Sequence, residues 1–148
     1  MFYGVYCHCV YLCGKFHLNK RIMNREIIFR GKRLDNDEWL YGDLMHDNQG
    51  GCYIYPLDAE NLYTENKVAT DTVGQFAGLV DKNGVKIFEG DWVLLEGVGI
   101  FNVRYSTSMC QFGLYGKRGF VDALKELQED RYVVVGNVYD NPELLATK

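Results

Sequence analysis

Proline and long apolar runs are both scarce in this chain. Only two of the 148 residues are Pro, and no apolar stretch reaches the ~18–20 residues that a membrane-spanning helix requires. A hydrophobic fraction of 47% and a charged fraction of 24% are ordinary for one globular domain, which excludes a disordered chain and a fibrous repeat. Sixteen Gly, eleven Tyr and eight Phe accompany the scarce Pro, and this composition favours strands joined by tight turns.

Histidine and cysteine are concentrated in the first 22 residues, which lack any acidic residue. The residues concerned are Cys7, Cys9, Cys13, His8 and His17. The basic residues of this segment follow its apolar part, whereas a secretory signal places them before it. We therefore expect residues 1–22 to be a leader outside the fold, with translation beginning at Met23. The alternative is a zinc site made of the three cysteines and His17, but this spacing is not that of a standard zinc motif.

Acidic residues outnumber basic ones once this leader is set aside. Residues 23–148 carry 13 Lys and Arg against 20 Asp and Glu, a net charge of −7. An acidic body repels phosphate backbones, which argues against non-specific nucleic-acid binding. One local group of basic side chains is an exception: Arg25, Arg30, Lys32 and Arg33. Only Cys52 and Cys110 remain in this body, too few for a disulfide framework, so a reducing cytoplasm is the expected setting.

The first half of the body predicts a β-hairpin followed by a third strand. Residues 25–34 and 38–45 predict two strands, with Ile27 and Phe29 on one face of the first. Asn and Asp stand between them and favour a turn, because their side chains hydrogen-bond to the nearby backbone. The third strand ends at Pro56, since Pro cannot donate to a sheet ladder.

A polar stretch divides the body into two portions. Residues 57–71 contain only scattered apolar side chains, which is typical of a long loop. We expect an N-terminal β-hairpin portion over residues 23–71 and a C-terminal portion over residues 72–148. The predicted fold class is mainly β, with two small packed β units and one or two short helices.

The C-terminal portion mixes three patterns. Residues 100–106 alternate apolar and polar side chains, which is typical of a half-buried antiparallel strand. Residues 120–130 place apolar side chains at helical spacing and predict a helix. Residues 131–140 are rich in Val and predict a strand in the centre of a sheet. The last residues, NPELL, predict a closing turn or a short terminal helix.

One stretch, GLVDKNGVKIFEGDWVLL at residues 78–95, concentrates the signals of a hairpin. Asp81 and Gly84 bracket a turn, because Asp favours turns and Gly accepts a positive φ. Gly90 allows a bulge that bends the strand, and we expect Asp91 to cap a turn through its side chain. A ligand loop or a catalytic carboxylate is the alternative. We interpret the stretch as a hairpin, because Asp and Gly are much commoner in turns than in sites.

Patterns that mark an active site are missing from the body. DNDEWL opens like a calcium loop, but Leu40 stands where Gly is needed and His46 where a Glu is needed. His46 could pair with Cys52 as a nucleophile, although a buried Cys more often packs as a small hydrophobe. No phosphate-binding Gly loop or Ser nucleophile elbow is present. The sequence therefore predicts no catalytic, cofactor-binding or metal-ligating residue, no cofactor and no enzymatic activity.

Three stretches carry a resemblance to a known family. In chain order they are REIIFRGKRL…WLYGDL, TVGQFAGLVDKNGVKIFEGDWV and VVGNVYDNPELL. Together they resemble the YopX family, whose members are encoded largely by phages and prophages. The resemblance covers the chain from about Met23 to Leu145 and leaves out the leader. It implies a mostly β protein whose second half is a small SH3-like barrel, and it supplies no catalytic residues. Small barrels host many unrelated functions, so the fold alone names none.

Two functions stay open on the sequence. The first is a non-enzymatic interaction module of the phage life cycle that binds an unidentified protein of host or phage. Abundant Tyr is typical of binding faces, although Tyr is also an ordinary sheet residue. The alternative is a small barrel that stacks single-stranded nucleic acid on aromatic side chains, which the net charge of −7 opposes. Either protein is expected in the cytoplasm of the bacterial host, away from membranes, and a homo-oligomer is compatible with both.

Overall fold

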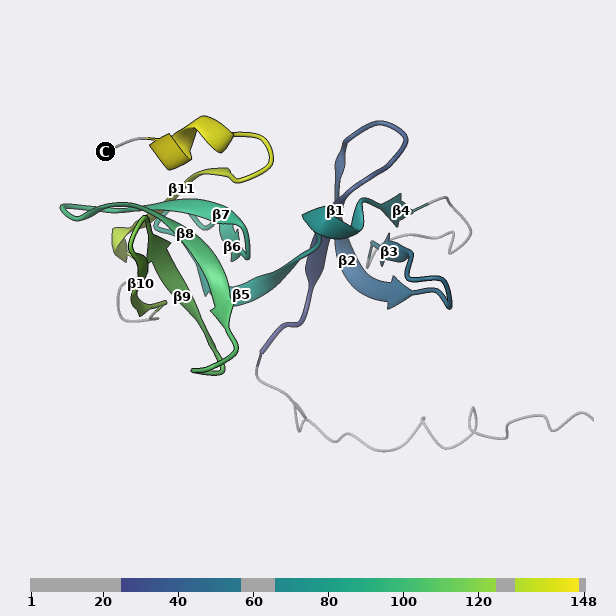
Figure 1. Cartoon of the computed structure of the whole chain (residues 1–148), viewed down its shortest axis with the longest axis horizontal. Helices are drawn as coiled ribbons and strands as arrows, with labels where there is room; N and C mark the ends of the chain where they lie inside the picture. Colours follow the sequence, from purple (N-terminus) through teal and green to yellow (C-terminus); the bar gives the residue numbers. More distant parts are fainter. Residues whose placement is uncertain (1–24, 57–65, 125–129, 147–148) are drawn as a thin grey trace, which may run out of the picture.

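The computed structural model describes residues 25–56, 66–124 and 130–146, and over these ranges the chain is mainly β (Figure 1). The strands form two antiparallel sheets, as the composition predicts. The first sheet contains β1 (Phe29–Lys32), β2 (Trp39–His46), β3 (Cys52–Tyr55), β4 (Lys67–Val68), β5 (Gly74–Val80) and β6 (Lys86–Phe88). The second contains β7 (Asp91–Leu95), β8 (Gly99–Ser106), β9 (Gln111–Gly116), β10 (Gly119–Ala123) and β11 (Tyr132–Asn137).

Strand β1 is buried on both of its faces. The first sheet runs in the order β4-β3-β2-β1-β5-β6, so β1 lies between two neighbours. Ile28, just before β1, packs with Phe76 and Phe88, while Phe29 packs on the opposite side against Cys52 and its apolar neighbours. The prediction that Ile27 and Phe29 share the apolar face is wrong for Ile27, which is 38% exposed, whereas Ile28 and Arg30 are buried. The strand is central and has no solvent face.

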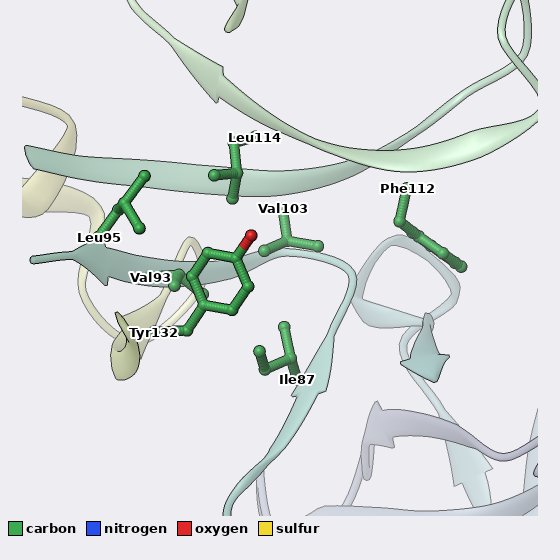
Figure 2. Packing of buried hydrophobic residues seen from close by; sticks show 7 residues of the cluster. All are labelled: Ile87, Val93, Leu95, Val103, Phe112, Leu114 and Tyr132. Carbon is green, nitrogen blue, oxygen red and sulfur yellow. The ribbon is translucent and has the colours of Figure 1, made fainter. Parts of the chain in front are cut away.

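The main core is built by the second sheet together with residues from the first. The second sheet runs in the order β10-β9-β8-β7-β11. Its buried side chains gather around Tyr132, whose ring lies among Val93, Val103 and Leu114 in Figure 2. Ile87 from β6 belongs to the same cluster, and residues of β5 pack against it. Because β5 and β6 pair with the first sheet and pack on the second, they join the two sheets into one body.

Two expectations about the C-terminal portion are wrong. Residues 119–123 form strand β10 instead of the start of a helix, because Phe120 pairs with Tyr115 of β9 across a tight turn. Residues 125–129 of that predicted helix lie outside the described residues. Strand β11 is an edge strand, although its Val-rich sequence predicts a central one. Its edge is covered by the turn after β5, where Lys82 N–H donates to the Tyr132 carbonyl at 3.1 Å and Val134 N–H donates to Asp81 at 3.0 Å.

The second sheet stays open over the described residues. Its edges β10 and β11 pair with β9 and β7, and no pairing joins the two edges to each other. The SH3-like closure that the family resemblance implies is therefore not observed. The segments Thr70–Thr72 and Pro142–Ala146 are 3-10 helices, and the second corresponds to the turn or short terminal helix predicted for NPELL. No helix in these ranges has the length and apolar character of a membrane span.

The hairpin predicted around Asp81 and Gly84 is confirmed. Asp81 and Val85 are joined by a backbone hydrogen bond of 2.8 Å, and Gly84 has a φ of 80°. The Asp81 carboxylate accepts the backbone N–H groups of Asn83 and Val85 as well as that of Val134 in β11. Burial tends to raise the pKa of Asp81, but these hydrogen bonds lower it below its usual value. Asp81 thus stabilises the hairpin and also binds the backbone of edge strand β11 in the other sheet.

Candidate functional site

A buried ion pair fixes the two sheets to each other. Arg30 of β1 contacts Asp91 of β7 at 2.6 Å, and the two side chains are only 6% and 2% exposed. Asp91 also accepts the backbone N–H of Phe88 at 2.8 Å, so the predicted turn cap is confirmed. The Arg30 guanidinium lies between the rings of Trp39, at 4.7 Å, and Phe88, at 5.1 Å. Burial raises the pKa of Asp91, although Arg30 and the Phe88 N–H act in the opposite direction.

The C-terminal turn is attached to the first sheet by a second polar cluster. Asp140 accepts hydrogen bonds from the Trp39 indole at 2.8 Å and the Asn137 amide at 2.7 Å, and it contacts Lys32 Nζ at 2.5 Å. Burial tends to raise the pKa of Asp140, but Lys32, Asn137 and Trp39 together lower it from 3.8 to about 2. The neighbouring Tyr139 donates its hydroxyl to the Asp71 carbonyl. These contacts hold the end of the chain against the first sheet.

Most of the basic side chains considered as a nucleic-acid patch are paired with acids in the structure. Arg30 and Lys32 pair with acids of the second half, and Arg33 pairs with Asp35. Arg25 is exposed and lines a hollow of about 610 Å3 together with Glu89 and Cys110. Three of the four cations are therefore already neutralised by the fold. The patch that the nucleic-acid alternative needs is not present as a free basic surface.

A row of side chains crosses the second sheet on the side opposite its core. Cross-strand pairing aligns Trp92 with Asn102, Asn102 with Tyr115 and Tyr115 with Phe120. Directly paired residues point to the same face, and their sequence neighbours Val93, Val103 and Leu114 fill the core on the other side. Arg104 follows Asn102 by two residues and shares its face. We call this surface the outer face, and it consists of Trp92, Asn102, Arg104, Tyr115 and Phe120.

Contacts between neighbours give the outer face a fixed shape. The rings of Tyr115 and Phe120 meet edge to face at 5.5 Å, and the Arg104 guanidinium lies 5.6 Å from the Tyr115 ring. Arg104 Nε donates to Asn102 Oδ1 at 2.6 Å, and Asn102 Nδ2 donates to the Asp91 carbonyl at 3.0 Å. A side chain at Gly113 would collide with the Phe120 ring, so this ring lies against the sheet. Phe120 nevertheless remains 38% exposed.

A hollow lies at the Trp92 end of the outer face. It has a volume of about 540 Å3, and we call it the Trp92 hollow. Its lining residues come from the second sheet, from the segments before β5 and β7 and from the C-terminal turn: Val73, Glu89, Gly90, Trp92, Asn102, Arg104, Val138, Tyr139 and Pro142. The polar clusters described above hold the C-terminal turn in place over Trp92. The Trp92 hollow thus lies at one end of the outer face, which carries the exposed ring of Phe120.

The residues weighed as catalytic or metal-binding candidates do not form such sites where the structure describes them. The stretch compared with a calcium loop is a turn followed by strand β2, which contains both Leu40 and His46. His46 and Cys52 are backbone partners across β2 and β3, but His46 is exposed while Cys52 packs with Ile54 and Val68. No group of three or more potential metal ligands occurs within the described ranges. The three leader cysteines and His17 lie outside those ranges.

The sequence pattern predicts only part of the outer face. The alternation over residues 100–106 correctly indicates that Asn102 and Arg104 share a face, but it predicts that face to be solvated. Asn102 is instead buried, because it bridges Asp91 and Arg104. The position of Trp92 beside them depends on the register between β7 and β8. Neither that register nor the position of the C-terminal turn can be predicted from the local sequence.

Comparisons with known proteins agree with this arrangement. A family profile described as YopX protein matches residues 28–146. The crystal structure of protein EF1440 from Enterococcus faecalis is similar, with a TM-score of 0.53 and 25% sequence identity over 82% of this chain and 99% of that one. No sequence among curated proteins matches this chain. Because the profile spans both sheets and the C-terminal turn, this chain belongs to the YopX family.

Proposed function

We propose that this chain is a non-enzymatic interaction module that binds a protein partner through its outer face. The observation that carries the proposal is the row of Arg104, Tyr115 and Phe120 beside a hollow of about 540 Å3 whose lining includes the buried Trp92. Trp, Tyr and Arg are the residues that contribute most to binding energy at protein interfaces, above all where they flank a pocket. Phe120 and Tyr139 are both large and exposed at this surface.

A protein partner fits the charge of the molecule better than a nucleic acid does. Residues 23–148 carry a net charge of −7, and three of the four cations considered for phosphate binding are paired within the fold. Trp92 is only 4% exposed, so its ring offers no open surface for stacking a base. Tyr115 and Phe120 contact each other, which also reduces the area open to bases. These features support a protein ligand.

The biological setting of the proposal follows from the family. Because YopX family members are encoded largely by phages and prophages, we place this chain in the cytoplasm of a bacterial host. Its partner is then a protein of the host or of the phage. In this setting the chain acts by binding another protein and catalyses no reaction itself.

The test is affinity purification of the full chain from phage-infected or lysogenic cells, followed by mass spectrometry. Three forms are compared: the native chain, the double variant Arg104→Glu with Phe120→Ser, and the control Met45→Ser. Met45 is exposed on strand β2 of the other sheet, so its replacement removes apolar surface away from the outer face. We expect one protein to be recovered with the native chain and the control but lost with the double variant. Equal recovery with all three forms would contradict binding through the outer face.

A further inference from the structure

The C-terminal turn, residues 138–146, lies next to Trp92. Trp92 pairs with Gly136 of β11, and a Cβ atom at Gly136 would come within 2.3 Å of Asn141 Oδ1 in the turn. Three further residues of the turn share the lining of the Trp92 hollow: Val138, Tyr139 and Pro142. Trp92 itself is 4% exposed. The turn therefore covers the Trp of the outer face.

Surface contacts, and not the apolar cores, hold this turn to the rest of the molecule. In the described part of the chain, no residue beyond Val134 belongs to any of the buried apolar clusters. The described attachments are the contacts of Asp140 with Lys32 and Trp39, the hydrogen bond of Tyr139 to the Asp71 carbonyl, the Tyr139–Trp39 ring contact, and the bond from Val138 N–H to the Gly90 carbonyl at 2.9 Å. A segment attached in this way can open at a smaller free-energy cost than unfolding of the sheets, because the cores stay intact.

The turn is also hydrogen-bonded within itself. Asn137 Oδ1 accepts the N–H groups of Tyr139 and Asp140 at 3.0 and 2.9 Å. Asn141 N–H donates to the Asn137 carbonyl at 2.9 Å. Gly136, which precedes this unit, has a φ of 150°, and the register between β7 and β11 shifts just before it. Small residues at the end of an element are typical hinges, so the turn can move as one unit about Gly136.

We infer that the C-terminal turn is an autoinhibitory strap, which covers Trp92 in the closed form and opens as a unit when the partner binds the outer face. The inference rests on the proposed function for the identity of the site that the strap restrains. Trp is among the side chains that contribute most to binding at protein interfaces, yet the closed form buries Trp92. A partner that contacts Trp92 binds only the open form and therefore shifts the equilibrium towards it.

The closed form also leaves one donor unsatisfied. Within the described residues the Trp92 indole Nε1 has no hydrogen-bond partner, whereas the Trp39 indole donates to Asp140 at 2.8 Å. A buried donor without an acceptor costs free energy. Opening of the strap relieves this cost, because water or the partner then supplies the acceptor.

Hydrogen exchange of the full chain, followed by proton–nitrogen NMR, tests whether the strap opens on its own. The chain has two Trp, so Trp92→Phe assigns the two indole signals. We expect the Trp92 indole N–H to have a protection factor at least about tenfold smaller than those of the slowest-exchanging amides of the second sheet, because it exchanges by local opening. A protection factor as large as that of those amides would overturn the inference.

The variant Asp140→Asn loosens the strap at a distance from Trp92. Asp140 contacts Trp39 and Lys32, so an effect on Trp92 has to pass through opening of the turn. We expect this variant to lower the protection of the Trp92 indole about fivefold. Asp43→Asn makes the same charge change at an exposed position on β2 and should alter it by less than about twofold. An effect of Asp140→Asn on the Trp39 indole alone would contradict opening as a unit.

Partner binding separates the strap from the proposed function. We expect Asp140→Asn to bind the recovered partner about fivefold more tightly than the native chain, because the open form is more populated. Faster exchange at Trp92 with unchanged affinity would overturn the autoinhibitory role. Rapid exchange at Trp92 supports opening of the strap even if no partner is recovered. Recovery of a partner through the outer face, with Trp92 as protected as the core, overturns this inference and leaves the proposed function standing.

Discussion

Gly84 has a backbone conformation that few other residues tolerate. Its φ is 80°, and no heavy atom lies within 4 Å of the position that a Cβ would occupy, so the cost of a side chain there is conformational and not steric. We predict that Gly84→Val lowers the free energy of unfolding by about 1–3 kcal/mol. Asn tolerates positive φ, so Gly84→Asn is the matched control and should cost much less. Urea denaturation measures both, and equal costs for Val and Asn would contradict the conformational explanation.

Strands β1 and β7 depend on each other through the Arg30–Asp91 pair. Removing one partner leaves a buried charge uncompensated, so we predict that Arg30→Met and Asp91→Asn each destabilise the fold by about 3–5 kcal/mol. The double variant leaves neither charge buried alone, and its cost should be less than the sum by about 2 kcal/mol or more. Urea denaturation of the three variants gives this coupling. Costs that add within ~0.5 kcal/mol would show that the two side chains do not stabilise each other.

Local features of the strands and turns could be predicted from the sequence, whereas contacts between distant strands could not. The hairpin at Asp81 and Gly84 was predictable because turn chemistry is local. The burial of Arg30 was not, because its partner lies on another strand far along the chain. Strand β10 was predicted as a helix because apolar spacing over a few residues fits both structures, and only pairing of Phe120 with Tyr115 decides between them. The outer face likewise depends on strand register, which tertiary packing sets.

At the scale of the whole molecule, the C-terminal turn closes one end of the Trp92 hollow and depends on the charge of Asp140. The pKa of this carboxyl is lowered to about 2 in the folded chain, against its ordinary value of 3.8. Its contribution to stability is therefore complete above pH ~4 and is lost as the pH falls towards ~2. Asp140 is 37% exposed, so solvent screening limits the effect to about 1 kcal/mol.

The corresponding prediction compares Asp140→Asn with the native chain by urea denaturation at several pH values. The variant should be less stable by about 1 kcal/mol at neutral pH, and the difference should shrink between pH ~4 and pH ~2. Asp43→Asn, which makes the same charge change at an exposed position on β2, controls for net charge. A stability difference that persists unchanged at pH ~2 would show that the charge of Asp140 is not what holds the turn.

The distribution of charge over the whole molecule predicts how the chain behaves towards nucleic acids. Residues 23–148 carry a net charge of −7, and Arg30, Lys32 and Arg33 are paired with acids inside the fold. We predict no measurable binding of random single- or double-stranded DNA at ~0.15 M salt, measured by fluorescence anisotropy. Weak binding through the remaining cations would appear only at low salt and fall steeply as salt rises, because each phosphate contact releases counterions. Micromolar binding of single strands at ~0.15 M salt that Arg104→Glu with Phe120→Ser abolishes would instead make the outer face a nucleic-acid surface, since exposed aromatics stack unpaired bases.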